Sequence, residues 1–360
     1  MSAGIGSQVN RAAVPSVAVQ PTASSPKPQR IRALDFTKGA LVLLMVLYHW
    51  INYFIGPQWG YYTYLRFLTP SFIFITGFMV SHVYLSKYGA TDPRLSKRLF
   101  TRGLKLLAVF LALNLARSLA VPLLGTDAPM ENLFSPRNIF AVFVSGNLPV
   151  VGGKLVSFSI LVSISYLLML SGVLMLPYRL YRYTFHFASV LLLLSVLTLG
   201  FVGGRSYNLE FVTIGMLGVL IGFIPIAAIN DFVRHPYGLG FAYVCYTIGI
   251  TLWNVRFALL VLGVPLSLMV IYLAAASSNE ASIIAREVIL LGRYSLFGYI
   301  SQIAILQILS AGFRRVNLGF TALAFSLFAA FVLTIVSVEV LQRARTRVAS
   351  VDRLYKAVFA

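Results

Sequence analysis

One apolar segment carries a cation near its start and a titratable imidazole near its end. The segment KGALVLLMVLYHW begins at Lys38 and reaches His49 eleven positions later, which is about 16 Å along a helix. At 100° per residue the two side chains share one face, with Asp35 one turn before Lys38. Ionisable groups inside membranes are costly and usually functional. We therefore interpret His49 as a catalytic acid–base group in preference to a histidine that only packs in the bundle. Lys38 alone is ordinary for a helix end facing the cytoplasm.

A second cluster is basic. The segment RLSKRLFTRGLKLL places Arg98, Arg102 and Lys105 together with two further cations, Arg94 and Lys97. Anionic lipid headgroups are one partner for such a patch. A phosphorylated cofactor is the other, because Arg and Lys at this density suit phosphate and pyrophosphate groups.

Several polar side chains interrupt otherwise apolar segments, and each could bind a substrate or satisfy a neighbouring helix. Ser295, Tyr299 and Gln302 follow the spacing i, i+4, i+7 and share one helix face. The remaining candidates for substrate binding are Asp35, Ser71, Thr76 and Glu210. The glycine beside Thr76, Gly77, is at least as consistent with close helix packing.

The composition places these residues in an integral membrane protein. The 360 residues are 59% hydrophobic and 11% charged, whereas soluble domains are roughly one quarter charged. We predict an all-α polytopic protein with about ten transmembrane helices, each near the ~20 residues that a bilayer core requires. The predicted spans are 34–55, 64–86, 99–122, 154–176, 185–204, 208–229, 239–256, 257–277, 288–311 and 317–341.

The basic residues predict the orientation. Most of the 29 Lys and Arg lie at one set of helix ends, and such residues collect on the cytoplasmic side, so both termini are predicted to be cytoplasmic. The net charge of +19 follows from this rule, and no nucleic-acid-binding motif accompanies it. Residues 1–31 read as a disordered cytoplasmic tail, 32–342 as the transmembrane domain and 343–360 as a basic cytoplasmic segment.

The single cysteine, Cys245, lies in an apolar stretch and reads as a small buried residue rather than a nucleophile. The sequence holds no Cys/His cluster with metal-ligand spacing. We therefore expect no metal.

The same segments resemble a known family. RALDFTKGALVLLMVLYHW is similar to the first-helix signature of the multi-span acyltransferase-3 superfamily, PSFIFITGFMV to its second-helix segment and RLFTRGLKLL to the basic start of its third helix. GRYSLFGYISQIAIL and the ending VDRLYKAVFA resemble its late segments. Two related branches look similar as well: heparan-glucosaminide N-acetyltransferase-like proteins and the membrane proteins that succinylate periplasmic glucans.

Three departures accompany the resemblance. Lys38 stands where the family has Arg, which keeps the charge and loses the bidentate fork. Gln302 stands where the family has a late His, so it can hydrogen bond but cannot carry a proton. A mid-chain Trp–Glu motif has no counterpart.

The resemblance implies an enzyme of the bacterial inner membrane that moves an acyl group, with acetyl favoured, from acyl-CoA to a hydroxyl of a glycan or lipid-linked sugar. In this interpretation Lys38, Arg98, Arg102 and Lys105 hold the CoA phosphates and His49 is catalytic, either as base or through an acyl-histidine. A proton-coupled transporter or flippase of a glycan or anion is the alternative. A non-catalytic membrane scaffold is the third possibility, favoured if Lys38 and Gln302 mark degeneration.

Overall fold

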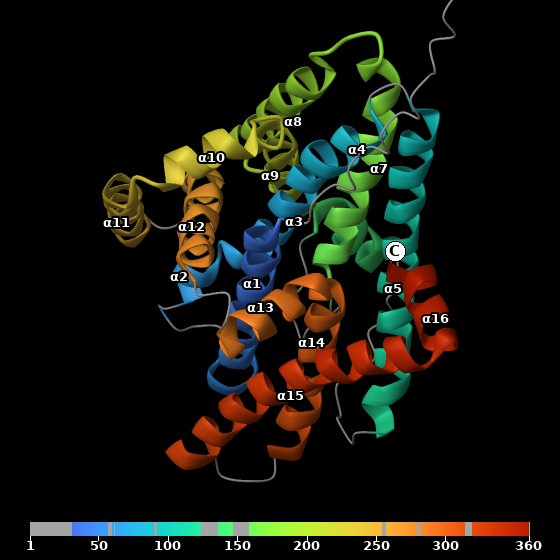
Figure 1. Ribbon diagram of the computed structural model, residues 1–360, viewed down its shortest axis with the longest axis vertical. Coiled ribbons are helices and arrows are strands. Elements are labelled where there is room, and N and C mark those ends of the chain that lie inside the picture. The colour runs from blue at the N-terminus through green and yellow to red at the C-terminus, as the bar shows by residue number, and fades with distance from the viewer. Residues whose placement is uncertain are drawn as a thin grey trace, which may run out of the picture. The chain divides into compact units, whose positions relative to one another are not determined.

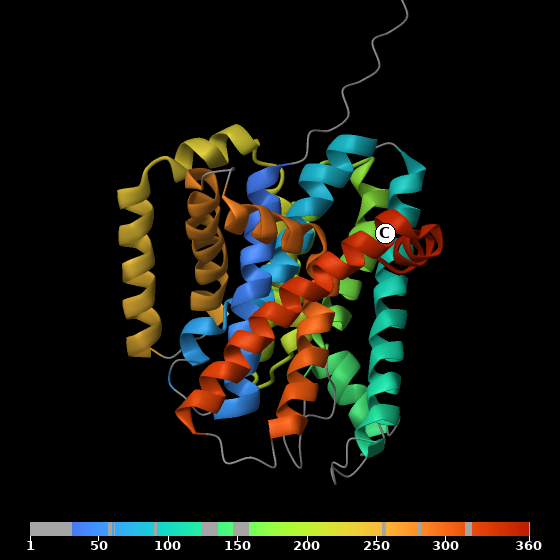
Figure 2. The same cartoon turned by 60° about the horizontal axis from the view of Figure 1, so that its bottom comes forward.

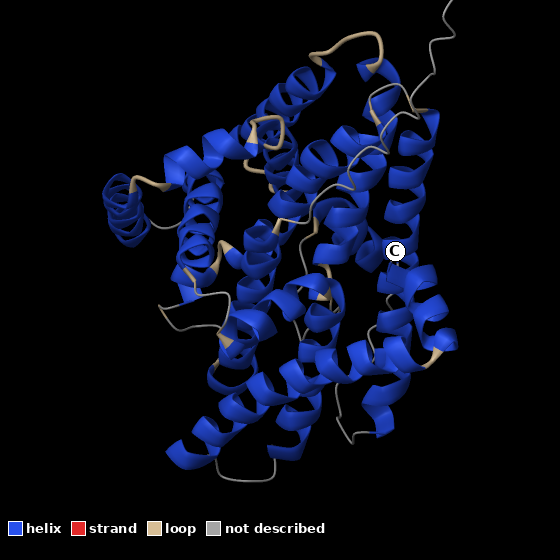
Figure 3. Cartoon of the chain, in the orientation of Figure 1, coloured by secondary structure: helices blue, strands red, loops and turns tan. Residues whose placement is uncertain are grey.

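The described residues of the computed structural model fold into helices, with no strand among them (Figure 3). They are 31–56, 60, 62–89, 92–123, 136–146, 158–253, 257–278, 282–313 and 319–359. The predicted tail 1–31 lies outside these ranges except for its last residue. The all-helical prediction is confirmed.

The helices follow one another along the chain as shown in Figure 1. The first half holds α1 (Arg32–Trp50), η1 (Ile51–Ile55), α2 (Tyr62–Leu65), α3 (Leu68–Met79), η2 (Val80–Leu85), α4 (Ser86–Tyr88), α5 (Pro93–Leu123), α6 (Pro136–Ile139), η3 (Phe140–Ser145) and α7 (Ile160–Tyr178). The second half holds α8 (Thr184–Phe201), α9 (Tyr207–Ile221), α10 (Ile226–Val233), α11 (Pro236–Trp253), α12 (Phe257–Ser277), α13 (Ile283–Arg293), α14 (Ser295–Phe313), α15 (Phe320–Arg347) and α16 (Ala349–Phe359). The three η segments are π-helical turns.

Among the described residues, eight helical segments are long and apolar enough to cross a membrane, or nine if α9 and α10 form one bent span. The sixth predicted span, 208–229, is that pair, which bends by 99°. The seventh, 239–256, coincides with α11, which is not among the eight. Its sequence PYGLGFAYVCYTIGITLW dilutes the apolar residues with Gly and Tyr. The cytoplasmic placement of the termini remains a prediction.

The ninth predicted span, 288–311, is broken in two. The chain leaves the helical conformation at Tyr294 (φ −111°, ψ 27°), and α14 begins at the next residue. The segment before the break, α13, packs along α1 instead of continuing α14, and Figures 1 and 2 show that it lies across the line of the long helices. Our single-helix prediction is wrong here, because apolar periodicity alone does not detect a one-residue break between two helices.

Glycines set the closest helix crossings. A Cβ added to Gly39 of α1 would lie 1.8 Å from the carbonyl oxygen of Val288, and one added to Gly292 of α13 would lie 1.6 Å from that of Asp35. The same relation holds between α3 and α9, where a Cβ on Gly77 would lie 1.9 Å from the Gly215 carbonyl oxygen. The close-packing interpretation of Gly77 is therefore confirmed. Small residues let helix backbones approach in membranes, and here they fix α1 against α13.

The core and the periphery differ as expected for a membrane protein. A buried cluster joins α1, α3, α5, α7, α9 and α14 through residues such as Leu41, Ile73 and Phe110. Large apolar side chains on other helices point outward, among them Phe187 of α8 and Phe241 of α11. These exposed surfaces suit contact with lipid, which is as apolar as they are.

The C-terminal helix α16 turns back toward α5 and is tied to the end of α15 (Figure 2). Arg345 lies 2.6 Å from the carboxylate of Asp352, which also pairs with Lys356 at 2.6 Å. The Arg345 guanidinium lies 3.9 Å from the centre of the Tyr355 ring. Residues 349–359 of the predicted basic C-terminal segment are thus an ordered helix.

Candidate functional site

A cavity opens between α1, α3, α5, α7 and α14, with α16 contributing one wall residue, Val358. Its empty volume, including the solvent at its mouth, is about 1030 Å³. Six of the predicted site residues lie in its wall: Lys38, Thr76, Arg102, Lys105, Ser295 and Tyr299. These side chains come from four helices, so the fold brings together half of the twelve residues that the sequence suggested separately.

The cations of the cavity are held by neighbours. Lys38 pairs with the buried Asp35 one turn earlier, at 2.6 Å between Nζ and the carboxylate oxygen. The Arg102 guanidinium lies over the ring of Tyr84 at 5.5 Å. Lys105 follows Arg102 by three positions and therefore lies on the same side of α5. Three cations facing one cavity can bind a ligand that carries several phosphate charges.

Arg98 is placed elsewhere. Its side chain is exposed, its guanidinium lies 4.7 Å from the centre of the Tyr88 ring, and it donates a hydrogen bond to the Tyr88 hydroxyl. It is not part of the cavity wall. Arg98 comes four positions before Arg102 on the same helix, so the basic patch is divided between the cavity and the α4 side of α5.

Tyr299 lies in the cavity wall within a group of aromatic rings. This side chain is buried, and its ring centre lies 6.0 Å from that of Phe72, 6.1 Å from that of Phe158 and 6.2 Å from that of His49. His49 is not in the cavity wall. It lies next to Tyr299, in the last turn of α1 and directly before the π-helical turn η1. Such π-helical turns are frequent at functional sites.

Phe158 is held in a strained conformation at this boundary. Its φ is 65°, in the left-handed region, which is a true outlier for a bulky residue. Its side chain is buried edge-on against Tyr299. Strain of this kind persists only where the surroundings determine the conformation and is concentrated at functional sites.

The remaining polar candidates separate into two groups. Thr76 and Ser295 face the cavity, although the Thr76 hydroxyl donates to the Phe72 carbonyl at 2.8 Å. Ser71 is fully buried and donates to the Phe67 carbonyl at 2.8 Å, so it satisfies its own helix. Ser295 reaches the wall because the break at Tyr294 places it in the first turn of α14.

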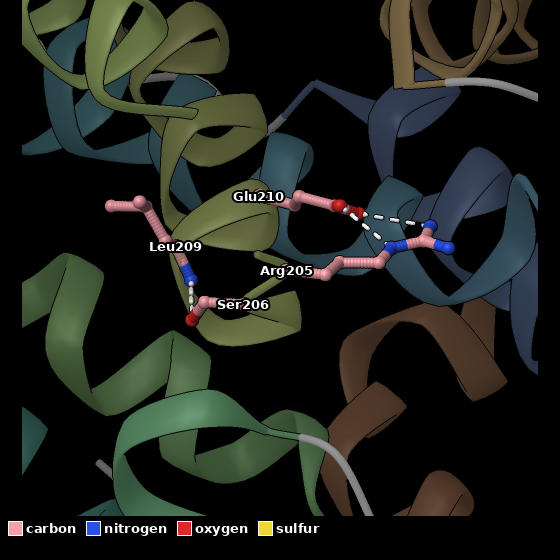
Figure 4. Close-up of polar contacts among 4 residues, drawn as sticks. All are labelled: Arg205, Ser206, Leu209 and Glu210. Carbon is pink, nitrogen blue, oxygen red and sulfur yellow. Dashed lines mark hydrogen bonds and ion pairs between the residues drawn. The ribbon is translucent and has the colours of Figure 1, made fainter. Parts of the chain in front are cut away.

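Glu210 lies outside the cavity wall. It is buried at the start of α9, where Arg205 Nε donates to its carboxylate at 2.9 Å (Figure 4). In the same turn the Ser206 hydroxyl accepts a hydrogen bond from the backbone N–H of Leu209, which caps the helix. This geometry accounts for Glu210 as an internal ion pair at a helix start.

Gln302 is the most unusual of the candidates. Its side chain is fully buried in α14, one turn after Tyr299, and neither amide atom has a hydrogen-bond partner among the described residues. An unsatisfied buried amide costs free energy, and each such group in a native protein calls for an explanation. A ligand that reaches beyond Tyr299 would supply one.

Sequence reasoning did not identify Tyr84 or Val358, which line the cavity. Both lie beside predicted site residues in space and not in sequence. Tyr84 comes from the π-helical turn η2, and Val358 from a C-terminal helix that we expected to be only a basic segment. A pattern of aromatic residues at helix ends near Arg and Lys could have indicated Tyr84.

Among the described residues no group of three or more His, Cys, Asp or Glu is arranged to hold a metal ion. Cys245 is exposed on α11 rather than buried, so that part of our interpretation is wrong. The predicted site residues that line the cavity are cations and hydroxyls, and the His49 imidazole lies beside one of them, Tyr299.

One family model matches part of the chain. Residues 30–124 match the family model for the catalytic domain of heparan-alpha-glucosaminide N-acetyltransferase. The match spans α1, α3 and α5, and therefore Lys38, His49, Thr76, Arg102 and Lys105. It supports a membrane acetyltransferase-like family, which is one of the related branches that the sequence resembles. No curated protein and no solved structure matches the chain.

Proposed function

We propose that the protein is a membrane-bound acetyltransferase that moves an acetyl group from acetyl-CoA to a hydroxyl of a glycan or lipid-linked sugar. The observation that carries this proposal is one cavity with three cations and Tyr299 in its wall, and with the His49 ring 6.2 Å from that of Tyr299. The family match over residues 30–124 supports the acetyl donor.

In this proposal the cations hold the charged part of the donor. Lys38, Arg102 and Lys105 face the phosphates, because guanidinium and ammonium groups make charge-assisted hydrogen bonds to phosphate oxygens. Asp35 fixes the Lys38 ammonium in place through their 2.6 Å contact. The pantetheine arm of CoA then follows α1 toward His49. The Cα atoms of Lys38 and His49 are about 16 Å apart along the helix.

His49 is the proposed base. An imidazole has an ordinary pKa near neutrality and can accept a proton from an acceptor hydroxyl. As the hydroxyl oxygen bonds to the thioester carbonyl carbon, its proton passes to His49. The carbon–sulfur bond then breaks, and the proton leaves with the CoA thiolate as a thiol. In the alternative route, the His49 imidazole nitrogen bonds to the thioester carbon, the carbon–sulfur bond breaks and CoA leaves as the thiolate. The acceptor hydroxyl then bonds to the acyl carbon, the carbon–nitrogen bond breaks, and the hydroxyl proton passes to the thiolate.

The acceptor side of the site belongs to the region around Gln302. The Gln302 amide can donate to and accept from a sugar hydroxyl. Gln302 follows Tyr299 by three positions, and both side chains lie on the buried face of α14. Gln302 can orient an acceptor in this way without taking part in proton transfer.

The decisive experiment is transfer of isotope-labelled acetyl from acetyl-CoA to glycan acceptors by the purified protein. His49→Gln keeps a hydrogen-bonding group and removes the base, and loss of a general base typically costs about 10²–10⁴-fold in rate. His82→Gln is the matched control, because His82 is also half-buried but contacts Gly222 and Phe78, away from the cavity. If His49→Gln keeps most of the activity, this mechanism is wrong.

A further inference from the structure

A second polar cleft lies between α1, α13 and α15, separate from the cavity of the proposed acetyl donor. Arginines from all three helices line it: Arg32 of α1, Arg286 and Arg293 of α13, and Arg343 of α15. Two carboxylates, Glu287 and Glu339, and Gln342 complete its polar wall. Its lining residues and those of the donor cavity have no member in common.

Positive charges outnumber negative ones among the residues that line this arginine cleft. Glu339 pairs with Arg343 at 2.7 Å, and Glu287 lies 3.4 Å from Arg286. Arg293 has no carboxylate partner among the described residues. Four guanidinium groups facing two carboxylates leave an excess of positive charge, and guanidinium groups suit phosphate oxygens because of their planar fork.

Apolar side chains continue from the cleft along the same helices. Ile283 and Ile284 at the start of α13 are 70% and 75% exposed. On α15, Val336 and Val340 are also exposed, and they share a face with Glu339 and Arg343 by the i, i+3, i+4, i+7 spacing. A ligand bound here would thus meet arginines at one end and exposed apolar helix surface at the other.

We propose that the arginine cleft binds the headgroup of an anionic phospholipid. The arginines would contact the phosphate, and the acyl chains would lie on the exposed valines of α15. Basic pockets between transmembrane helices bind such headgroups, and an amphipathic helix such as α13 suits the membrane interface. A soluble phosphate compound would use the arginines but leave the apolar surface uncovered.

The test is a lipid titration of the purified full-length protein in detergent, followed by native mass spectrometry with phosphatidylglycerol as the probe. Arg286→Gln combined with Arg293→Gln is expected to weaken the apparent affinity about 30-fold, since each basic residue near a membrane surface contributes about a fivefold factor. Arg179→Gln combined with Arg182→Gln removes the same charge from exposed positions between α7 and α8 and should leave the affinity unchanged.

Three results would overturn the proposal. The first is equal binding by the Arg286/Arg293 double variant and the wild type, or equal losses in both double variants. The second is binding of phosphatidylcholine as tight as that of phosphatidylglycerol, or displacement of the lipid by inorganic phosphate at millimolar concentration. The third is a parallel loss of acetyl-CoA affinity in the Arg286/Arg293 variant, which would make the cleft part of the donor site. If the double variant does not fold, the same lipid titration is made with the single variant Arg293→Gln.

Discussion

The rings of His49 and Tyr299 lie 6.2 Å apart, with Tyr299 in the cavity wall and His49 behind it. In the proposed enzyme, an acyl group in the cavity contacts the Tyr299 phenol on its way to the imidazole. Tyr299 therefore limits how large an acyl group can reach His49.

Shortening Tyr299 should change the preference for the acyl chain. Tyr299→Ala removes a buried ring between the cavity and His49, and each added methylene in an apolar pocket is worth roughly 1–3 kcal/mol. We expect the ratio of kcat/KM for propionyl-CoA, which has one more methylene, over acetyl-CoA to rise about tenfold. Tyr299→Phe keeps the ring and should keep the wild-type ratio. An unchanged ratio in Tyr299→Ala would mean that another part of the site limits the size of the acyl group.

Arg98 and Arg102 provide a matched pair for the donor site. They occupy one helix four positions apart, but only Arg102 faces the cavity. Arg102→Gln should weaken acetyl-CoA binding by the ~1.5–3 kcal/mol of one charge-assisted hydrogen bond, roughly tenfold to a hundredfold. Arg98→Gln should leave the affinity unchanged. Calorimetric titration of each variant measures this, and equal losses would show that both act through long-range charge only.

Replacing Gln302 by an apolar residue should raise the stability of the protein and lower its activity. Because neither amide atom is hydrogen bonded within the described residues, Gln302→Met removes an unsatisfied group of similar size, which costs about 1–3 kcal/mol when buried. The variant is expected to unfold at a higher temperature and to transfer acetyl more slowly. Thermal unfolding and transfer assays on the same preparation test both halves. A lower unfolding temperature would mean that Gln302 is a structural partner within the fold.

The C-terminal helix should loosen when its ion pairs are lost. Hydrogen bonds from Lys356 and Arg345 lower the pKa of Asp352 below its ordinary value. A lowered carboxylate pKa stabilises the docked helix above the ordinary value of about 3.9, and this contribution is lost as the pH falls through the lowered pKa. Asp352→Asn should reproduce the loss at neutral pH.

Hydrogen exchange of residues 349–359 measures this docking. We expect faster exchange in Asp352→Asn and no change in Asp231→Asn, whose carboxylate pairs with Arg234 at the end of α10. A weaker affinity for acetyl-CoA should accompany the faster exchange, because Val358 lines the cavity. Unchanged exchange would show that the stacking of Arg345 on Tyr355 is sufficient to hold α16.

The sequence predicted local features better than their assembly. Apolar runs located most spans, and the basic spacing on α5 identified Arg102 and Lys105. Periodicity could not separate Arg98 from Arg102, because the difference depends on which neighbour each side chain meets, Tyr88 or Tyr84. It could not detect the break at Tyr294, which depends on the packing of α13 against α1. Glu210 looked available in sequence because Arg205, five positions away, pairs with it only through the turn between α8 and α9.

The cavity draws its wall from both ends of the chain: Lys38 comes from the first long helix, and Ser295, Tyr299 and Val358 from the last ones. A ribosome must therefore release α14 before the imidazole of His49 can face the ring of Tyr299. Partly synthesised or prematurely terminated chains have membrane-spanning helices without an assembled site. By the same logic, we expect a chain cut between α7 and α14 to lose the proposed activity unless both pieces are produced together.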